Sequence, residues 1–397
     1  MSQSLIVCAA LSADKLKAQL APSAGRAGFN IEIAGHIPAV NAYLVRIDTP
    51  DVGRARDYRR MLLGDGHVVA ADRKLIPPRT TYHRQQPIRR WRLRAGPRSL
   101  RSSGVAIGVL DADGVIDHPT FGGRLERYVL ENDAMVIGAH QVSGPEGSAV
   151  ASVAAGGVPI ASPAPNARVL AYQTPSVWAM MKAIEHFMTT ANGCVLVTAW
   201  EIQPKEPGEE DGFEALVQKA RDQGIVMLAA AGNDGPKEGT LSGPAKVPAI
   251  VAVGGFRDGE DLTPVGFKRA DPTDLVHEQS ARGTAGAQPA KPDFLQFFGS
   301  HEVLLRNGKR GAASGTSMAV ARAAGVVATW YSQYGGRQSA TVPTGMTAAE
   351  LADLFDQQAG WVALHDKSTN KLYDPHEQGR GAMNEDEFAK LVKARRP

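Results

Sequence analysis

Three short segments of the chain carry side chains that together could perform nucleophilic chemistry. Asp111 follows the apolar run VAIGVL, Asn233 lies in the small-residue stretch AAAGNDGP, and Ser317 lies in the segment SGTSMA. A serine hydroxyl can attack a carbonyl, an amide can donate to the oxyanion that forms, and a carboxylate can orient the reacting groups. Each segment alone could also be a turn or a helix cap.

The elements expected around these residues would place all three at one edge of a sheet. Beyond residue 104, apolar runs alternate with amphipathic stretches, which is typical of parallel strands joined by crossover helices. In such sheets, reactive groups gather where strands end and helices begin. We expect strands at 105–110, 169–172, 195–199, 225–230 and 250–253. We expect helices at 147–155, 177–188, 213–222 and 316–331, and a further one opened by a capping box of Thr347 with Glu350.

Residues 1–78 are expected to form a small α+β unit of their own. Their apolar runs and helical patterns follow the order β-α-β-β-α-β, which usually gives two helices on one face of an antiparallel sheet, here closed by a turn at 76–78. Residues 79–103 follow as a linker, because eight arginines and no acid occur at 79–101. We expect an exposed linker that is open to proteolysis rather than a contact with RNA or lipid.

Composition excludes several classes of protein. The chain has 44 Lys and Arg against 41 Asp and Glu, a balance that argues against a dedicated nucleic-acid or membrane-surface protein. Cys8 and Cys194 each lie in an apolar run, so neither a disulfide scaffold nor a cysteine metal site is expected. Scattered histidines and the lack of a glycine-rich dinucleotide motif predict no metal and no cofactor. We recognise neither a signal peptide nor a membrane-spanning run, so the expected compartment is the cytoplasm.

The order of the chemical segments resembles that of the subtilisin-like serine peptidases. SGTSMA at 314–319 is similar to their nucleophile motif, AAAGNDGP at 229–236 to their oxyanion segment, and VAIGVLDADGVIDHPTF at 105–121 to their aspartate segment. The resemblance implies a three-layer α/β fold with a central, mostly parallel sheet over 104–397.

The same resemblance extends to the start of the chain. The unit at 1–78 is similar to the ferredoxin-like, inhibitory prodomain of these peptidases. This implies that residues 71–78 lie in or beside the substrate cleft.

The chain departs from the family at the catalytic base. In the family, a His-Gly-Thr motif opens a helix and its histidine is the general base, whereas the matching stretch here reads GPEGSAVASVAAG, with Glu146 in that place. Either His118 or His140 would need a large backbone departure to replace it. A carboxylate with an ordinary pKa of about 4.3 is a weak base at neutral pH, although burial could raise that pKa.

A second departure lies in the substrate-binding strand. The family usually has Ser-Trp-Gly or a similar small-residue end there, whereas this chain has Ala199, Trp200 and Glu201. The charged side chain of Glu201 could crowd the entrance of the pocket for the residue before the cleaved bond, or it could select a basic residue there. Two further departures are Ala321 in place of a proline and Asp113 in place of a glycine.

Two functions stay open on this evidence. In the first, which the loss of the imidazole favours, the protein is a pseudopeptidase whose cleft binds a peptide, a partner protein or its own N-terminal domain. In the second, which the complete nucleophile and oxyanion motifs favour, it is an endopeptidase that could process its own linker. The resemblance to sedolisins, relatives with a Ser-Glu-Asp triad, implies a triad of Ser317, Glu146 and Asp111 with Asn233 as oxyanion donor.

The analogy with sedolisins is incomplete. They take the aspartate from the helix that carries the glutamate, where this chain has Val150, and they replace the oxyanion asparagine by aspartate. We nevertheless expect Glu146 to lie within hydrogen-bonding reach of both Ser317 and Asp111.

Overall fold

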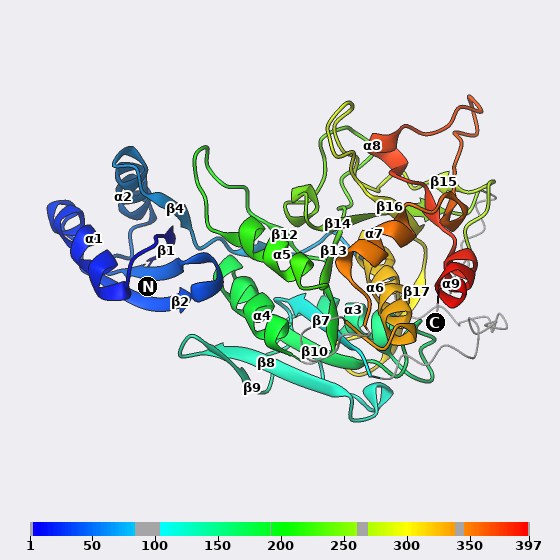
Figure 1. The fold of residues 1–397 in the computed structure, drawn as a ribbon, viewed down its shortest axis with the longest axis horizontal. Helices are drawn as coiled ribbons and strands as arrows, with labels where there is room; N and C mark the ends of the chain where they lie inside the picture. Colours follow the sequence, from blue (N-terminus) through cyan, green and yellow to red (C-terminus); the bar gives the residue numbers. More distant parts are fainter. Residues whose placement is uncertain (1–2, 84–103, 191, 260–268, 338–344, 396–397) are drawn as a thin grey trace.

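A computed structural model describes residues 3–83, 104–190, 192–259, 269–337 and 345–395. A small unit lies at one end of the molecule and a large sheet-centred unit makes up the rest (Figure 1). Residues 84–103, most of the expected linker, lie outside the described residues.

The N-terminal unit has the expected β-α-β-β-α-β order. Its antiparallel sheet has the strand order β2-β3-β1-β4. Leu16, Leu20 and Leu62 of the two helices pack on one face of this sheet, where they form a core with Leu5 and Val45. The elements are β1 (Gln3–Cys8), α1 (Ala13–Ala27), β2 (Ile31–Ile37), η1 (Pro38–Val40), β3 (Ala42–Ile47), α2 (Val52–Gly64) and β4 (Val68–Ala71).

The large unit is built on a mostly parallel sheet, as predicted. Among the described residues its strand order is β19-β20-β16-β14-β13-β11-β7-β10-β8-β9, with β15 beside β14. The pairs from β20 through to β8 are parallel, and β9, β15 and β19 are antiparallel to their neighbours.

The bounds of β7, β10, β11, β13 and β14 agree with the five predicted runs to within a few residues. The strands are β7 (Ala106–Asp111), β8 (Leu125–Glu131), β9 (Ala134–Ile137), β10 (Arg168–Gln173), β11 (Gly193–Thr198), β13 (Val226–Ala230), β14 (Val251–Arg257), β15 (Leu275–Val276), β16 (Phe294–Phe297), β19 (Trp361–Val362) and β20 (Ala382–Met383).

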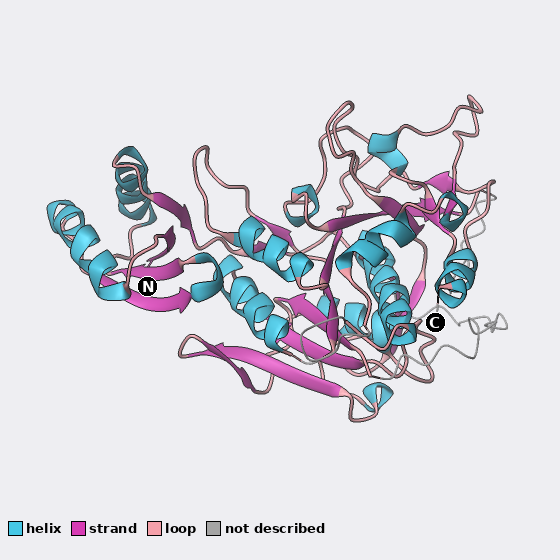
Figure 2. Ribbon diagram, viewed as in Figure 1, coloured by secondary structure: helices cyan, strands magenta, loops and turns pink. Residues whose placement is uncertain are grey.

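Helices cover both faces of this sheet (Figure 2). The helices α3 (Glu146–Ala155) and α6 (Thr316–Gln333) share the core on one face, and α4 (Val177–Thr189) and α5 (Phe213–Asp222) share the core on the other. This gives the three layers expected for the fold. The remaining helices are η2 (Pro119–Phe121), η3 (Pro244–Lys246), α7 (Ala348–Phe355), η4 (Gln358–Gly360), α8 (Pro375–Gln378) and α9 (Glu385–Ala394). The predicted capping box of Thr347 with Glu350 opens α7.

The segment that follows β4 does not form the predicted closing turn. Parts of it, up to residue 83, pair with strands of the large unit instead of forming a free linker. Strand β5 (Leu75–Ile76) pairs antiparallel with β12 (Glu201–Ile202) of the large unit. Strand β6 (Thr81–His83) then adds to a hairpin of β17 (His301–Leu304) and β18 (Arg310–Ser314). The prediction was wrong for residues 76–83 because local composition cannot show pairing with strands more than 100 residues away.

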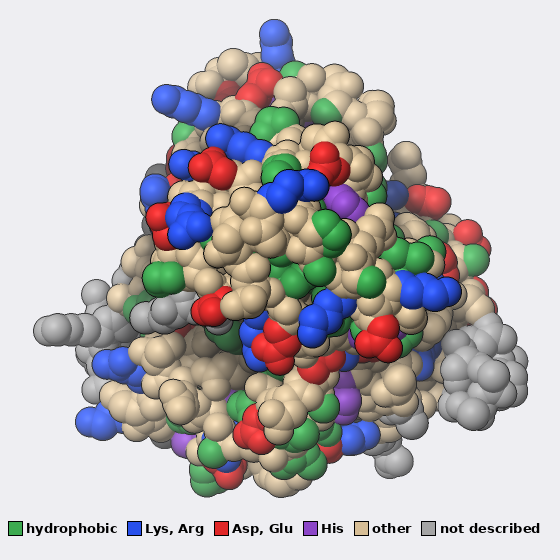
Figure 3. Space-filling model, turned by 90° about the vertical axis from the view of Figure 1, so that its left-hand side faces the viewer, with side chains coloured by type: hydrophobic (Ala, Val, Ile, Leu, Met, Phe, Trp, Pro, Cys, Tyr) green, Lys and Arg blue, Asp and Glu red, His purple; other side chains and the backbone are tan. Residues whose placement is uncertain are grey.

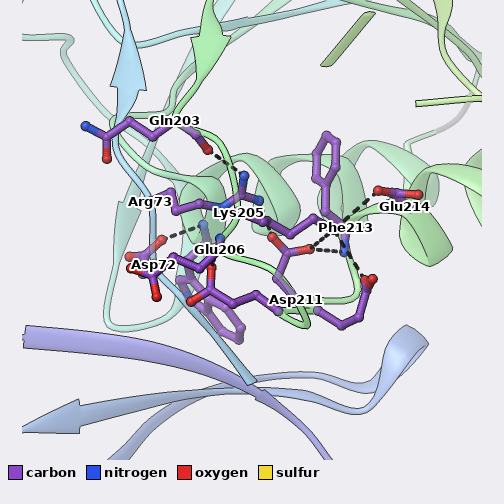
Figure 4. A network of polar contacts seen from close by, with 11 residues as sticks. Asp72, Arg73, Gln203, Lys205, Glu206, Asp211, Phe213 and Glu214 are labelled. Atoms are coloured by element: carbon purple, nitrogen blue, oxygen red, sulfur yellow. Dashed lines mark hydrogen bonds and ion pairs between the residues drawn. The ribbon is translucent and has the colours of Figure 1, made fainter. Parts of the chain in front are cut away.

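Buried charges join the two units where β4 leads into β5 (Figure 4). The guanidinium of Arg73 donates to a carboxylate oxygen of Asp211 and, at 2.7 Å, to the carbonyl oxygen of Gln203. The neighbouring Asp72 accepts a hydrogen bond of 2.9 Å from the backbone N–H of Trp178, in the first turn of α4. These contacts hold the N-terminal unit against the large unit, beside β12 and the start of α4.

The surface at the N-terminal end carries mixed charge. Lysine and arginine side chains lie interspersed with aspartate and glutamate over this face, without a large area of one sign (Figure 3). Within the described part of the chain, no helix is long and apolar enough to cross a bilayer.

Candidate active site

Ser317 lies in the first turn of α6, at the point where the chain leaves β18. Its side chain is fully buried. Gly315, with a φ of 148°, makes the turn from strand to helix in a backbone conformation that side chains rarely adopt. The backbone N–H and the hydroxyl of Thr316 both donate to Asn233 Oδ1, at 2.9 and 3.0 Å. Because its oxygen is held in this way, Asn233 directs its Nδ2 group away from α6 and into the cleft.

Asp111 is the last residue of β7 and is buried, with 1% of its surface exposed. Its Oδ1 atom accepts from the backbone N–H groups of Asp113 and Gly114 at 2.8 and 3.1 Å, and Oδ2 accepts from the indole Nε1 of Trp200 at 2.7 Å. Burial and the nearby charge of Glu146 raise the pKa of Asp111 well above its usual value. Both carboxylate oxygens of Asp111 are therefore engaged.

Glu146 is the first residue of α3 and is 3% exposed. Its backbone N–H donates to Asp113 Oδ2 at 3.4 Å, so Asp113 helps to cap this helix. A Cβ atom on the next residue, Gly147, would lie 2.6 Å from Asp111 Oδ1 and 2.5 Å from the carbonyl oxygen of Gly114. Glycine at that position lets α3 approach β7 closely enough to bring the two carboxylates together.

The environment of Glu146 shifts the pKa of its carboxyl group toward neutral pH. Burial raises its pKa from 4.5 to about 7, and Asp113 adds to the rise, while the hydroxyls of Tyr82, Ser317 and Thr80 lower it. A carboxylate with such a pKa can accept a proton near neutral pH, as a general base must.

The expected contacts of Glu146 are found in part. Ser317 interacts with Glu146 and lowers its pKa, but its hydroxyl is hydrogen-bonded to Thr80, and among the described residues no hydrogen bond joins Glu146 directly to Ser317 or to Asp111. The charge of Glu146 raises the pKa of Asp111. The expectation was wrong for Asp111 because the Trp200 indole and two backbone N–H groups take its oxygens. The carboxylates of Asp111 and Glu146 are neighbours that do not form a hydrogen-bonded dyad.

The histidines near the site, His140 and His118, form hydrogen bonds with backbone groups. His140 is buried, its Nδ1 accepts from the N–H of Val115 at 2.9 Å, and its Nε2 lies 3.0 Å from the carbonyl oxygen of Tyr128. Burial lowers its pKa to about 4. The ring of His118 accepts from the N–H of Thr120 at 3.1 Å. No histidine whose side chain the structure describes forms a hydrogen bond with Ser317.

The chain's own segment 76–83 runs through the cleft. Ile76 pairs with Glu201 on one side of the site, and Tyr82 pairs with Ala313 on the other. Between them, the carbonyl oxygen of Arg79 accepts from Asn233 Nδ2 at 3.4 Å. The next residue, Thr80, places its hydroxyl 2.9 Å from Ser317 Oγ.

Two side chains of this segment contact the candidate base. The hydroxyl of Thr80 donates to Glu146 Oε1 at 3.1 Å, and the hydroxyl of Tyr82 donates to Glu146 Oε2. Sequence reasoning missed both residues because they lie in a stretch that its arginines mark as an exposed linker. Of the eight arginines in that stretch, Arg79 lies among the described residues, and it pairs with Asp234.

The residues predicted for the substrate strand divide between two roles. Ala199 and Trp200 are buried, and the indole of Trp200 faces Asp111 rather than the peptide. Glu201 lies in β12 against the bound segment, and burial raises its pKa, as does the charge of Asp234, while the charge of Arg79 lowers it. The guanidinium of Arg79 also pairs with Asp234 at 2.7 Å.

Replacing Glu146 by glutamine should stabilise the folded protein in a pH-dependent way. The folded state raises the pKa of Glu146 from 4.5 to about 7, so its ionisation costs stability as pH rises through this window. In a Ser317→Ala background, Glu146→Gln should raise the free energy of unfolding by roughly 3 kcal/mol at about pH 8 and by little near pH 4.5. Urea unfolding at both pH values measures this, and an equal gain at both would contradict the titration.

Comparison with known proteins identifies the family of the chain. A profile of the subtilase family matches residues 102–381, which is more than half of the chain, so the protein belongs to the subtilase family. Subtilisin E of Bacillus subtilis strain 168 is 29% identical over 180 residues, which are 45% of this chain and 37% of subtilisin E. Subtilisin of Bacillus pumilus is 29% identical over 158 residues, or 39% of this chain and 47% of that one. The matched regions thus span less than half the length of these relatives.

Solved structures with the same fold extend the likeness to the N-terminal unit. The epidermin leader peptide processing serine protease of Staphylococcus aureus superposes with a TM-score of 0.63 at 14% identity, over 98% of each chain. Fervidolysin of Fervidobacterium pennivorans, a keratinolytic enzyme related to subtilisin, gives a TM-score of 0.67 at 16% identity, over all of this chain and 62% of that one. The large unit therefore has the subtilisin fold.

Proposed function

We propose that the protein is a serine peptidase that cleaves its own chain between Arg79 and Thr80, with Glu146 as general base. The observation that carries the proposal is the position of the Arg79 carbonyl. Its oxygen accepts from Asn233 Nδ2, and the following residue lies against Ser317 Oγ. Strand pairing on both sides, through β5 and β6, holds this peptide bond across the nucleophile.

The chemistry follows from these positions. Ser317 Oγ attacks the carbonyl carbon of Arg79 as its proton passes toward Glu146, and Asn233 stabilises the oxyanion that forms. Protonated Glu146 then gives the proton to the nitrogen of Thr80, and the bond to Arg79 breaks. Water hydrolyses the resulting ester between Arg79 and Ser317. The charge of Asp113, whose carboxylate accepts from the backbone N–H of Glu146, adds to the raised pKa of Glu146.

The residue before the cleaved bond is expected to be basic. Arg79 pairs with Asp234 at 2.7 Å, and its charge also acts on Glu201. Glu201 stands where the resemblance places a glycine, and it would attract an arginine to this position. We infer that the N-terminal unit is a prodomain, removed by this cleavage, and that peptides or proteins with an arginine before the bond are its substrates.

One observation favours the pseudopeptidase as a second candidate. Asp111 forms its hydrogen bonds with Trp200 and the backbone, so Glu146 lacks the carboxylate partner that orients the base in related peptidases. In that case the cleft would bind residues 76–83 without cutting them, and the N-terminal unit would stay attached.

The test is the fate of one peptide bond. Purified full-length protein is incubated at about pH 8 and analysed by intact-mass spectrometry. It should yield one fragment that ends at Arg79 and another that begins at Thr80. A Ser317→Ala variant should stay intact under the same conditions. An uncut wild-type chain would support the pseudopeptidase, and cleavage that persists in Ser317→Ala would indicate a contaminating protease.

A further inference from the structure

A single hydroxyl group connects the nucleophile to the base. Thr80 Oγ1 lies 2.9 Å from Ser317 Oγ and 3.1 Å from Glu146 Oε1. Thr80 is also the residue whose nitrogen would leave in the proposed cleavage. The group between nucleophile and base therefore belongs to the substrate rather than to the enzyme.

The direction of these two hydrogen bonds follows from their chemistry. A hydroxyl has one proton to donate, and an ionised carboxylate can only accept. When Thr80 donates to Glu146 Oε1, it can interact with Ser317 only as an acceptor. The Ser317 hydroxyl then donates to Thr80, which gives a continuous chain of donors from the nucleophile to the base.

The second oxygen of Glu146 is occupied from the other side. Tyr82 donates to Oε2, and its side chain comes from the same bound segment. Thr80 and Tyr82 together hold the carboxylate with Oε1 turned toward the nucleophile. This orienting role belongs in related enzymes to a partner carboxylate, and Asp111 does not provide it here.

We propose that the Thr80 hydroxyl relays the proton from Ser317 to Glu146 when the bond between Arg79 and Thr80 is cut. This inference rests on the proposed self-cleavage. As Ser317 Oγ forms its bond to the Arg79 carbonyl carbon, its proton passes to Thr80 Oγ1, and the proton of Thr80 passes to Glu146 Oε1. Thr80 is unchanged by this exchange. Protonated Glu146 then gives one proton to the Thr80 nitrogen as that nitrogen leaves.

A substrate preference follows from the relay. A second peptide would be cut rapidly only if serine or threonine directly followed the cleaved bond. A chain without that hydroxyl would depend on direct transfer from Ser317 to Glu146, which is the alternative route because the two side chains also interact. The site would then cut its own chain readily and cut most other peptides slowly.

Matched threonine variants of the full-length protein test the relay. Thr80→Val keeps the shape of the side chain and removes the hydroxyl, and Thr80→Ser keeps the hydroxyl. Thr81→Val is the control, since Thr81 is the exposed neighbour and pairs with Ser314 through its backbone. The rate of appearance of the fragment beginning at residue 80 is measured by mass spectrometry at about pH 8, beside Ser317→Ala.

We expect Thr80→Val to cleave about a hundredfold or more slowly, and Thr80→Ser and Thr81→Val to stay within about threefold of the wild-type rate. Far-ultraviolet circular dichroism and the melting temperature verify that each variant folds. If Thr80→Val cleaves as fast as Thr81→Val, the relay is wrong and the proposed self-cleavage stands. If the wild-type chain is never cut, the self-cleavage fails, and the relay fails with it.

Discussion

A Glu146→Gln variant is expected to cleave the bond between Arg79 and Thr80 about 10²- to 10⁴-fold more slowly than the wild-type chain at about pH 8. Glutamine fills the same space, and its oxygen can accept from one of the Thr80 and Tyr82 hydroxyls while its NH2 group donates to the other. It cannot take the proton from the nucleophile. The variant therefore separates the chemical role of the carboxylate from its part in holding the peptide, and the rate of fragment formation measures the difference.

The pH dependence of the wild-type rate gives a second readout of the same residue. Because the base must be ionised and burial raises the pKa of Glu146 to about 7, cleavage should speed up as pH rises through about 7 and level off above it. The residual rate of Glu146→Gln should lack this rise. A rate that is highest at acid pH would instead point to a proton shared between Asp111 and Glu146.

Glu201→Gln is the matched control for this experiment. It also removes a carboxylate from the cleft, but Glu201 lies in β12, and among the described residues no hydrogen bond joins it to Ser317. Glu201→Gln should weaken the binding of the Arg79 side chain and leave the shape of the pH profile of the cleavage rate unchanged. If Glu146→Gln and Glu201→Gln slow cleavage equally, Glu146 is not the base.

The sequence was sufficient for the framework of the site. Asp111, Asn233 and Ser317 each follow or open an element whose pattern is clear in the sequence, because buried parallel strands are continuous apolar runs. Such strands end at the same edge of the sheet, so the sequence pattern alone predicts that the three residues lie together. The position of Glu146 followed instead from the resemblance of its stretch to the family's histidine motif, and the structure places it at the start of α3.

The partners of these residues could not be predicted, since they come from distant parts of the chain. Trp200 donates to Asp111 across 89 residues, and Thr80 contacts Ser317 across 237. Neither contact leaves a local pattern. The route of residues 76–83 depends on open strand edges at β12 and β18, which only the folded large unit presents.

The substitutions around the base form one consistent set. The resemblance implies an imidazole donor for Asp111, and in this chain the indole of Trp200 donates to it at 2.7 Å. Asp113 stands in place of a glycine and accepts from the N–H of Glu146 and, at 2.8 Å, from the hydroxyl of Ser143. The framework thus fixes the backbone of Glu146, while the bound segment fixes its carboxylate.

Replacing Arg73 by methionine is expected to weaken the docking of the N-terminal unit by roughly 3–5 kcal/mol. Arg73 and Asp211 are both buried, and their ion pair links the two units beside β5 (Figure 4). Methionine preserves most of the length of the side chain but leaves the carboxylate of Asp211 with the N–H of Phe213 at 3.0 Å and with Lys205 at 4.0 Å. A buried charge that loses its partner is costly because water cannot reach it.

Hydrogen exchange in an uncleaved Ser317→Ala background measures this loss. The amides of β5 should exchange faster in Arg73→Met, while those of β7 in the large sheet should not change. Arg60→Met is the control, since the ion pair of Arg60 with Glu206 at 3.5 Å is half-exposed and its loss should cost less than about 1 kcal/mol. Equal protection in the two variants would contradict the role of Arg73.

The docking of the N-terminal unit also bears on catalysis. β5 enters the cleft directly after Arg73, and its pairing with β12 sets the register that brings Arg79 to Asn233. In a chain with an intact Ser317, Arg73→Met should therefore slow self-cleavage while leaving its pH dependence unchanged, because Glu146 is not altered. A second change, Asp211→Asn, removes the unpaired charge and should restore part of the docking energy. Asp211→Asn, added to Arg73→Met, could restore the hydrogen-exchange protection of β5 without restoring the rate of self-cleavage. In that case the ion pair positions the segment in a way that stability alone does not explain.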